Sequence, residues 1–218
     1  GQRKIGHTGT LDPAATGVLP ICLGSGTKLC SLLTDKDKEY MAELLLGVRT
    51  DTQDTTGRVL EENSVEVTED AVRAACLSFV GDYQQVPPMY SALKVNGRRL
   101  YELAREGKEV ERKARPVTIL ALEILELRLP VVKIRVACTK GTYIRTLCAD
   151  IGEKLGCGGA MQSLRRTRVG KFTLEQAVTL GQLQERKDSA RLAEALLPVE
   201  SCFRGYPCLT VRAGADKF

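Results

Sequence analysis

The sequence predicts an α+β protein whose sheet is mainly antiparallel. Short β-rich runs and amphipathic helical segments mix along the chain without the regular alternation that builds a parallel sheet. The 218 residues, 43% of them hydrophobic, suffice for one substantial core and a small appendage. The longest apolar runs, such as residues 43–48, are far shorter than the roughly 18 residues of a membrane helix. We therefore expect a globular protein without a membrane span.

Local sequence patterns predict the individual helices and strands. Residues 38–62 are typical of two strands around a polar turn region. Residues 68–81 predict a helix, because a threonine can cap it, acids fill its first turn and a glycine ends it. Residues 85–100 indicate an extended segment with an Asn-Gly turn. The rest of the chain predicts, in order, a short basic helix (98–107), two antiparallel strands (115–140), an amphipathic helix (142–156), a strand and then a helix capped by Thr173 (161–177), and a polar helix (182–197) broken by Pro198.

Cysteine and histidine usage indicates a reduced protein without a metal. None of the eight cysteines forms a C-x-x-C pair, and most lie inside apolar patterns, so we interpret them as core thiols of a cytosolic protein. A zinc site would need clustered ligands, and the chain has one histidine.

The positive charge of the chain is concentrated in two segments. The net charge is +5, but residues 85–116 and residues 160–171 each carry +4, so the remainder is slightly acidic. Two such basic patches favour a polyanionic partner, nucleic acid above all. Two solvated faces are the simpler alternative.

The stretch GHTGTLDPAATGVLP (6–20) is the most unusual local pattern. A phosphate-binding Walker loop is excluded, because the nearest string, GSGTKL (24–29), has the wrong order and spacing. Asp12 precedes a proline and is followed by small residues, which leave room for a large group to approach its carboxylate. A structural aspartate in a turn remains the alternative.

A catalytic carboxylate needs a cation and a shaped pocket. KGTYIRT (140–146) offers Tyr143 and Arg145, and an arginine can pair bidentately with a carboxylate. Tyr40 begins a predicted strand, and His7 lies between glycines. By themselves, such residues are more often a surface arginine, a half-buried strand aromatic and a structural or solvated histidine.

Five stretches together resemble the bacterial tRNA pseudouridine synthases of the TruB type. They are GHTGTLDPAATGVLPICLGSGTK, DKEYMAELLLGVRTDTQDTTG, VPPMYSALKVNGRRLYELAREG, KGTYIRTLCADIGEKLG and LRRTRVGKF, in the family's order and spacing over roughly residues 1–200. The resemblance implies the pseudouridine synthase fold, with a catalytic domain over 1–198 and a basic insertion that grips RNA at about 85–116. It implies the start of a C-terminal RNA-binding domain at 199–218, with a first strand at about 206–212. We expect the chain to lack the family's N-terminal strand region and most of that last domain.

The resemblance also implies roles for individual residues. Asp12 would be the catalytic aspartate, Arg145 its partner, and Tyr40 the ring that stacks on the target uracil and could take the final proton. Tyr143 and Leu164 would line the pocket, His7 would stack in the space left by the flipped nucleotide, and Lys28 would support the site. Contacts to the RNA backbone would come from Lys94, Arg98, Arg99, Arg105, Arg165 and Arg166.

The implied reaction is the isomerisation of uridine 55 in the T loop of tRNA to pseudouridine. It needs no cofactor and no metal, and we expect a cytoplasmic monomer that requires no protein partner. Two other hypotheses are a tRNA-folding chaperone with secondary catalysis and a glycosidase, which would need a second acid beside Asp12. The sharpest geometric prediction is that Asp12 and Arg145 lie within hydrogen-bond reach, roughly 2.7–3.2 Å.

Overall fold

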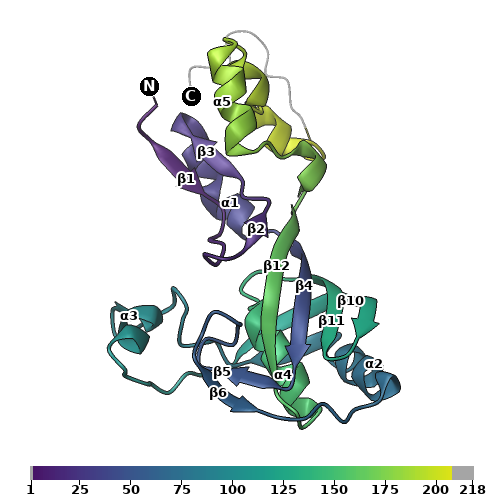
Figure 1. Cartoon of the computed structure of the whole chain (residues 1–218). Coiled ribbons are helices and arrows are strands. Elements are labelled where there is room, and N and C mark those ends of the chain that lie inside the picture. The colour runs from purple at the N-terminus through teal and green to yellow at the C-terminus, as the bar shows by residue number, and fades with distance from the viewer. Residues whose placement is uncertain (1, 208–218) are drawn as a thin grey trace. The chain divides into compact units, whose positions relative to one another are not determined.

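The computed structural model describes residues 2–207, and the chain divides into two compact units, residues 1–176 and residues 177–218 (Figure 1). This division falls earlier in the chain than the predicted domain boundary at residue 198. The first unit contains every residue predicted for the site.

A seven-stranded sheet forms the centre of the first unit and confirms the predicted α+β class. Six of its strands follow the order β13-β12-β4-β11-β10-β7, and β2 pairs with β12. Every pairing is antiparallel except that of β2 with β12, which is parallel. The strands are β2 (Thr16–Gly17), β4 (Lys38–Leu46), β7 (Gly81–Gln85), β10 (Arg115–Arg128), β11 (Val131–Cys138), β12 (Gly159–Val169) and β13 (Phe172–Thr173).

Two helices pack on this sheet and complete the core. The helix α2 (Glu69–Leu77) begins after Thr68, whose hydroxyl accepts a hydrogen bond from the Ala71 N–H, as the sequence predicts. The helix α4 (Ile144–Lys154) has a buried apolar face that shares one cluster with β4, β10 and β11. At Gly152, any Cβ would collide with the backbone of Gly158 and Gly159, where β12 begins, so glycine allows the helix to approach the sheet closely.

A separate small ribbon precedes the sheet. Its strands β1 (Ile5–His7) and β3 (Ile21–Leu23) are antiparallel, and the loop between them carries β2 and Asp12. The 3-10 helix η1 (Gly24–Leu29) and the helix α1 (Cys30–Thr34) follow directly. The stretch 6–20 is therefore a loop held at both ends by strands, with a third short strand on the main sheet.

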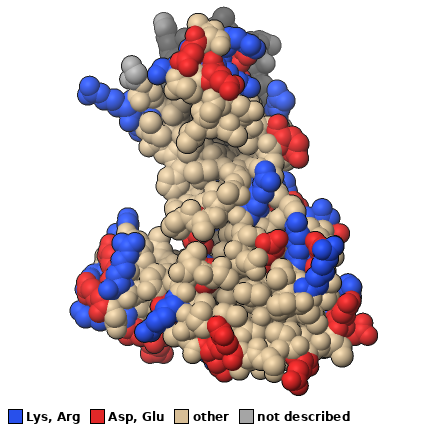
Figure 2. Space-filling model, in the orientation of Figure 1, with Lys and Arg blue, Asp and Glu red and all other residues tan. Residues whose placement is uncertain are grey.

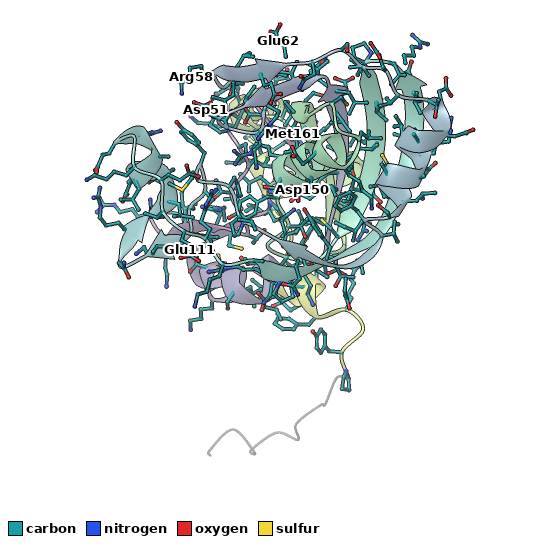
Figure 3. All side chains as sticks on the ribbon, turned by 90° about the horizontal axis from the view of Figure 1, so that it is seen from below. Asp51, Arg58, Glu62, Glu111, Asp150 and Met161 are labelled. Atoms are coloured by element: carbon teal, nitrogen blue, oxygen red, sulfur yellow. The ribbon has the colours of Figure 1, made fainter. Side chains whose placement is uncertain are left out.

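Two hairpins project from the sheet. Strands β5 (Val48–Thr50) and β6 (Val59–Glu62) form the first, and Figure 3 shows Asp51, Arg58 and Glu62 together at this hairpin. The sequence predicted two strands over 38–62, whereas the chain forms three, because Gly47 adopts a φ of 85° and ends β4. The second hairpin, in the predicted insertion, joins β8 (Lys94–Val95) to β9 (Arg98–Arg99) and leads into α3 (Leu100–Arg105). Its Asn-Gly turn has φ values of 51° and 82°, as predicted.

The end of the chain differs from the prediction. Thr173 ends β13 and is followed by the 3-10 turn η2 (Leu174–Gln176), whereas the helix α5 (Leu180–Asp188) begins after Thr179. Gln182 forms a capping box with Thr179, and Gln176 likewise accepts a hydrogen bond from the Thr173 N–H, so this contact alone does not decide where the α-helix begins. The predicted polar helix ends early: Ala190 has a φ of 57°, and the 3-10 turns η3 (Leu192–Ala195) and η4 (Val199–Phe203) are the elements that follow it up to residue 207. Most of the strand predicted at 206–212 lies outside the described residues.

Candidate active site

The carboxylate of Asp12 forms a bidentate ion pair with Arg145. The Arg145 Nε donates to Oδ2 at 2.7 Å, and a terminal nitrogen donates to Oδ1 at 3.1 Å. The arginine side chain is 5% exposed and that of Asp12 is 35% exposed, so the pair is buried on one side and open on the other. The geometric prediction for these two residues, 133 positions apart, is therefore confirmed.

Two further hydrogen bonds of Arg145 end on main-chain carbonyls from two other segments. One terminal nitrogen donates to the carbonyl of Thr52 at 2.9 Å, and the other donates to the carbonyl of Tyr90 at 2.9 Å. Arg145 lies in the first turn of α4, and its guanidinium thus joins the Asp12 loop, the β5–β6 loop and the base of the insertion. Four hydrogen bonds leave the group little rotational freedom, which fixes the position of the carboxylate.

A second carboxylate near Arg145, that of Asp54, is absent from the sequence-based predictions. Its Oδ2 lies 3.8 Å from the Arg145 Nε, and its side chain is 15% exposed. Its Oδ1 accepts hydrogen bonds from the hydroxyls of Thr52 and Thr56 at 2.8 and 2.6 Å. The sequence signal for Asp54 is the run of Asp and Thr in TDTQDTTG, but its proximity to Arg145 is visible only in the folded chain. These contacts hold Asp54 in place and thereby shape the loop that passes beside Arg145.

Tyr40 and Leu164 face the core from neighbouring strands. Tyr40 lies on β4 opposite Arg166 of β12, and Ala42 lies opposite Leu164, so all four side chains share one face of the sheet. Tyr40 is 9% exposed. Burial raises the pKa of its phenol to about 12, although the positive charge of Arg166 opposes the shift. The hydroxyl therefore stays protonated at neutral pH.

The prediction that Arg166 contacts the RNA backbone is wrong, because its side chain is buried and unavailable to an RNA phosphate. It is 1% exposed, and its Nε donates to the carbonyl of Val18 at 2.7 Å. A terminal nitrogen donates to the carbonyl of Gly9 at 3.0 Å. Val18 and Gly9 flank the loop that carries Asp12, so Arg166 ties both ends of that loop to β12. Gly17, with a φ of 108°, is needed here because a Cβ would collide with the Arg166 carbonyl.

We expect Arg166→Met to lower the free energy of unfolding by about 2–4 kcal/mol, because it leaves the carbonyls of Gly9 and Val18 buried without donors. Urea denaturation monitored by circular dichroism measures the change. The neighbouring Arg165 is exposed, and Arg165→Met is the matched control, with an expected change within about 0.5 kcal/mol. Equal losses in the two variants would contradict the role assigned to Arg166.

Tyr143, His7 and Lys28 are the remaining residues predicted for the pocket. Tyr143 directly precedes α4, and burial raises the pKa of its phenol. His7 ends β1 and Lys28 lies in η1, and both are exposed. Neither forms a hydrogen bond or ion pair with Asp12, Tyr40 or Arg145 in the described part of the chain. The structure thus joins Asp12 to Arg145 directly and leaves His7 and Lys28 at the surface.

Five of the six predicted RNA-backbone residues are exposed. Arg165 lies on β12, and the others lie on the insertion: Lys94, Arg98, Arg99 and Arg105. Within the insertion, the guanidiniums of Arg99 and Arg105 lie 5.7 and 5.3 Å from the centre of the Tyr101 ring. Figure 2 shows Lys and Arg side chains gathered over this segment together with acids. Arg98 is one of those paired, since it forms an ion pair with Glu106.

Within residues 2–207, no helix is long and apolar enough to cross a membrane. No group of three His, Cys, Asp or Glu side chains in this range is arranged to hold a metal ion.

Two family models match the chain in succession, and named relatives share about half of its residues. The family model described as the TruB family pseudouridylate synthase N-terminal domain matches residues 1–144. The tRNA pseudouridylate synthase B C-terminal domain matches residues 145–204. The chain is 52% identical over 199 residues to the tRNA pseudouridine synthase B of Alkaliphilus oremlandii, covering 91% of this chain and 66% of that protein. It is 53% identical over 211 residues to that of Burkholderia mallei, covering 97% and 70%. The chain thus spans about two thirds of the length of these relatives.

Solved structures show the same fold. A chain in the crystal structure of a Cbf5-Nop10-Gar1 complex is 32% identical with a TM-score of 0.71, covering 91% of this chain and 53% of that one. A chain in an H/ACA RNP bound to a substrate RNA containing 2'-deoxyuridine is 29% identical with a TM-score of 0.68, covering 91% and 51%. With two family domains matched in succession and curated relatives above 50% identity, the chain belongs to the TruB family of pseudouridylate synthases.

Proposed function

We propose that this chain is the catalytic part of an enzyme that isomerises uridine 55 in the T loop of tRNA to pseudouridine. The observation that carries the proposal is the Asp12–Arg145 pair, with the arginine buried and the carboxylate one third exposed. A buried cation fixes the reactive group, and an open side leaves it accessible to a nucleotide. The curated relatives are named tRNA pseudouridine synthase B, and this chain spans about two thirds of their length.

The reaction rearranges bonds without any net addition. The bond between C1′ of the ribose and N1 of uracil breaks, the base turns over, C5 bonds to C1′, and the proton on C5 moves to a nitrogen. Asp12 could attack the sugar, attack the base or remove a sugar proton. In each of these roles it needs a fixed carboxylate, which the two hydrogen bonds from Arg145 supply.

Tyr40 suits stacking better than proton abstraction. A phenol is protonated at neutral pH, and burial raises the pKa of this one further, to about 12. A protonated phenol accepts a further proton poorly, whereas its ring can still pack against a flipped uracil. We therefore assign Tyr40 to holding the base beside Asp12, with Leu164 on the next strand and Tyr143 at the start of α4 as further walls.

The base must leave its stack before the carboxylate can reach the nucleotide. His7 is exposed at the end of β1 and would fill the vacated space. The insertion would grip the T arm, and Lys28 would support the site from η1. We propose that the enzyme acts as a monomer in the bacterial cytoplasm without a protein partner.

Nucleoside analysis of a T-arm RNA incubated with the chain tests the proposal. We expect one pseudouridine for each RNA, located at the position of uridine 55 by reverse-transcription stops after carbodiimide treatment. The same RNA with cytidine at that position is the control and should give none. Tight binding without any pseudouridine would favour the chaperone hypothesis instead.

We expect Arg99→Gln combined with Arg105→Gln to weaken tRNA binding and make it less dependent on salt. Both side chains are exposed and carry their guanidiniums near the Tyr101 ring, where they can reach phosphates. The slope of log K against log salt should fall by about 0.7–0.9 for each phosphate that the variant no longer neutralises. Filter binding at several salt concentrations measures it, and Arg128→Gln, whose side chain is 84% exposed on β10, is the control. An unchanged slope in the double variant would remove these two residues from the RNA interface.

A further inference from the structure

Gln85 makes an unusual pair of contacts for a residue outside the predicted site. It is the last residue of β7 and is 1% exposed. Its Oε1 accepts a hydrogen bond from the N–H of Tyr143 at 2.8 Å, and its Nε2 donates to the carbonyl of Tyr143 at 3.0 Å. One carboxamide thus satisfies both main-chain groups of a residue 58 positions away, as a neighbouring strand would.

The orientation of this carboxamide is fixed by a second contact. The Tyr83 hydroxyl donates its hydrogen to Asp150, which is labelled in Figure 3, so the phenolic oxygen can only accept from Gln85. The Gln85 Nε2 lies 3.4 Å from that oxygen. The amide nitrogen therefore faces Tyr83 and the Tyr143 carbonyl, and the amide oxygen faces the Tyr143 N–H.

The backbone at Tyr143 determines where the tyrosine ring and the nearby Arg145 guanidinium lie. It is the residue before α4, with extended φ and ψ of −99° and 110°, and no side chain caps the helix. Arg145 follows two residues later. A change in the backbone at Tyr143 would turn the tyrosine ring and move the guanidinium that holds Asp12.

The same short segment reaches α4 a second time. Tyr90, five residues after Gln85, gives its carbonyl to Arg145 at 2.9 Å. Pro87 and Pro88, both buried, lie between the two contacts and restrict the backbone. Residues 85–90 are therefore attached to the start of α4 at both ends, and they lead directly into the insertion.

We propose that Gln85 is a positioning residue, which holds Tyr143 and Arg145 in register with Asp12 and ties the base of the insertion to the active site. It does not touch the substrate, since its side chain is fully buried. The proposal rests on the proposed function for its catalytic consequence, and on the hydrogen bonds to Tyr143 for its structural one.

Single-turnover kinetics on T-arm RNA, with tRNA affinity measured separately, test the catalytic consequence. We expect Gln85→Met to lower the rate constant about 10- to 100-fold, because small displacements of reacting groups cost that much. Its Kd for tRNA should stay within about threefold of wild type. Gln84 is exposed on the same strand, and Gln84→Met should leave both quantities unchanged. A Gln85→Met rate within twofold of wild type would overturn the proposal.

Two further measurements keep the test decisive. If Gln85→Met unfolds at the assay temperature, Gln85→Glu replaces it; this variant keeps the acceptor for the Tyr143 N–H and loses the donor to its carbonyl. We expect it to react more slowly than wild type, and a wild-type rate would refute the role. If the wild-type chain makes no pseudouridine, the proposed function fails, and amide hydrogen exchange over residues 141–147 then decides. Exchange there should be at least about tenfold faster in Gln85→Met than in Gln84→Met, and equal exchange would refute the positioning role.

Discussion

Replacing Asp12 by asparagine is expected to abolish pseudouridine formation while folding and tRNA binding survive. Asparagine has nearly the same shape, so its amide oxygen can still accept a hydrogen bond from Arg145. An amide, however, is neither the nucleophile nor the base that the three possible roles of Asp12 require. The rate should fall by at least about 10⁴-fold, which is the size of the loss when one member of a set of catalytic residues is removed.

Mass spectrometry of nucleosides from digested T-arm RNA measures this loss, and gel shifts measure binding. Asp37→Asn is the matched control, because Asp37 is an exposed aspartate just before β4 and should behave as wild type. Pseudouridine from the Asp12→Asn variant at anything near the wild-type yield would refute Asp12 as the catalytic residue. Loss of binding together with the product would point to a misfolded loop.

Replacing Arg145 by methionine should damage stability as well as activity. The change leaves the carboxylate of Asp12 and the carbonyls of Thr52 and Tyr90 without their donors. Breaking a fully buried pair costs about 3–5 kcal/mol. Because the Asp12 side chain is 35% exposed and water can reach it, we expect about 2–4 kcal/mol here. Catalysis should fall at least about 10³-fold in molecules that remain folded, since the carboxylate loses its orientation.

Urea denaturation and single-turnover assays at low temperature separate the two effects. Arg135→Met is the control, because Arg135 forms an exposed ion pair with Glu123 and should contribute less than about 1 kcal/mol. Arg145→Lys should recover part of the stability and little of the rate, because a lysine cannot form the two-pronged pair. Full activity in Arg145→Lys would mean that charge alone, without the fork geometry, supports Asp12.

Features that depend on neighbouring residues were predictable from the sequence. Thr68 caps α2 through the N–H three residues on, and the Asn-Gly turn needs only its own two residues. Thr173 shows the limit of such rules: it resembles a helix cap, but the segment after it is the 3-10 turn η2, and the α-helix begins after Thr179. Such rules judge each possible helix cap from its own neighbouring residues and do not compare two caps along the chain.

Features that depend on distant residues were predicted only through the family resemblance, or not at all. The pairing of Asp12 with Arg145 joins residues 133 positions apart, which no spacing rule anticipates. Arg166 was grouped with Arg165 as a surface cation, because charge patterns do not reveal that alternation along β12 turns one inward. Asp54 was missed because its approach to Arg145 depends on a bridge between Asp54 and Met161 of β12.

Two of the four hydrogen bonds that hold Arg145 end on main-chain carbonyls, which every amino acid possesses. At positions 52 and 90, Arg145 therefore depends on the path of the backbone and not on the identity of the side chain. A substitution of Thr52 would still remove the hydroxyl that donates to Asp54. A variant library at position 90 can therefore diversify the side chain while the Asp12–Arg145 pair stays constant.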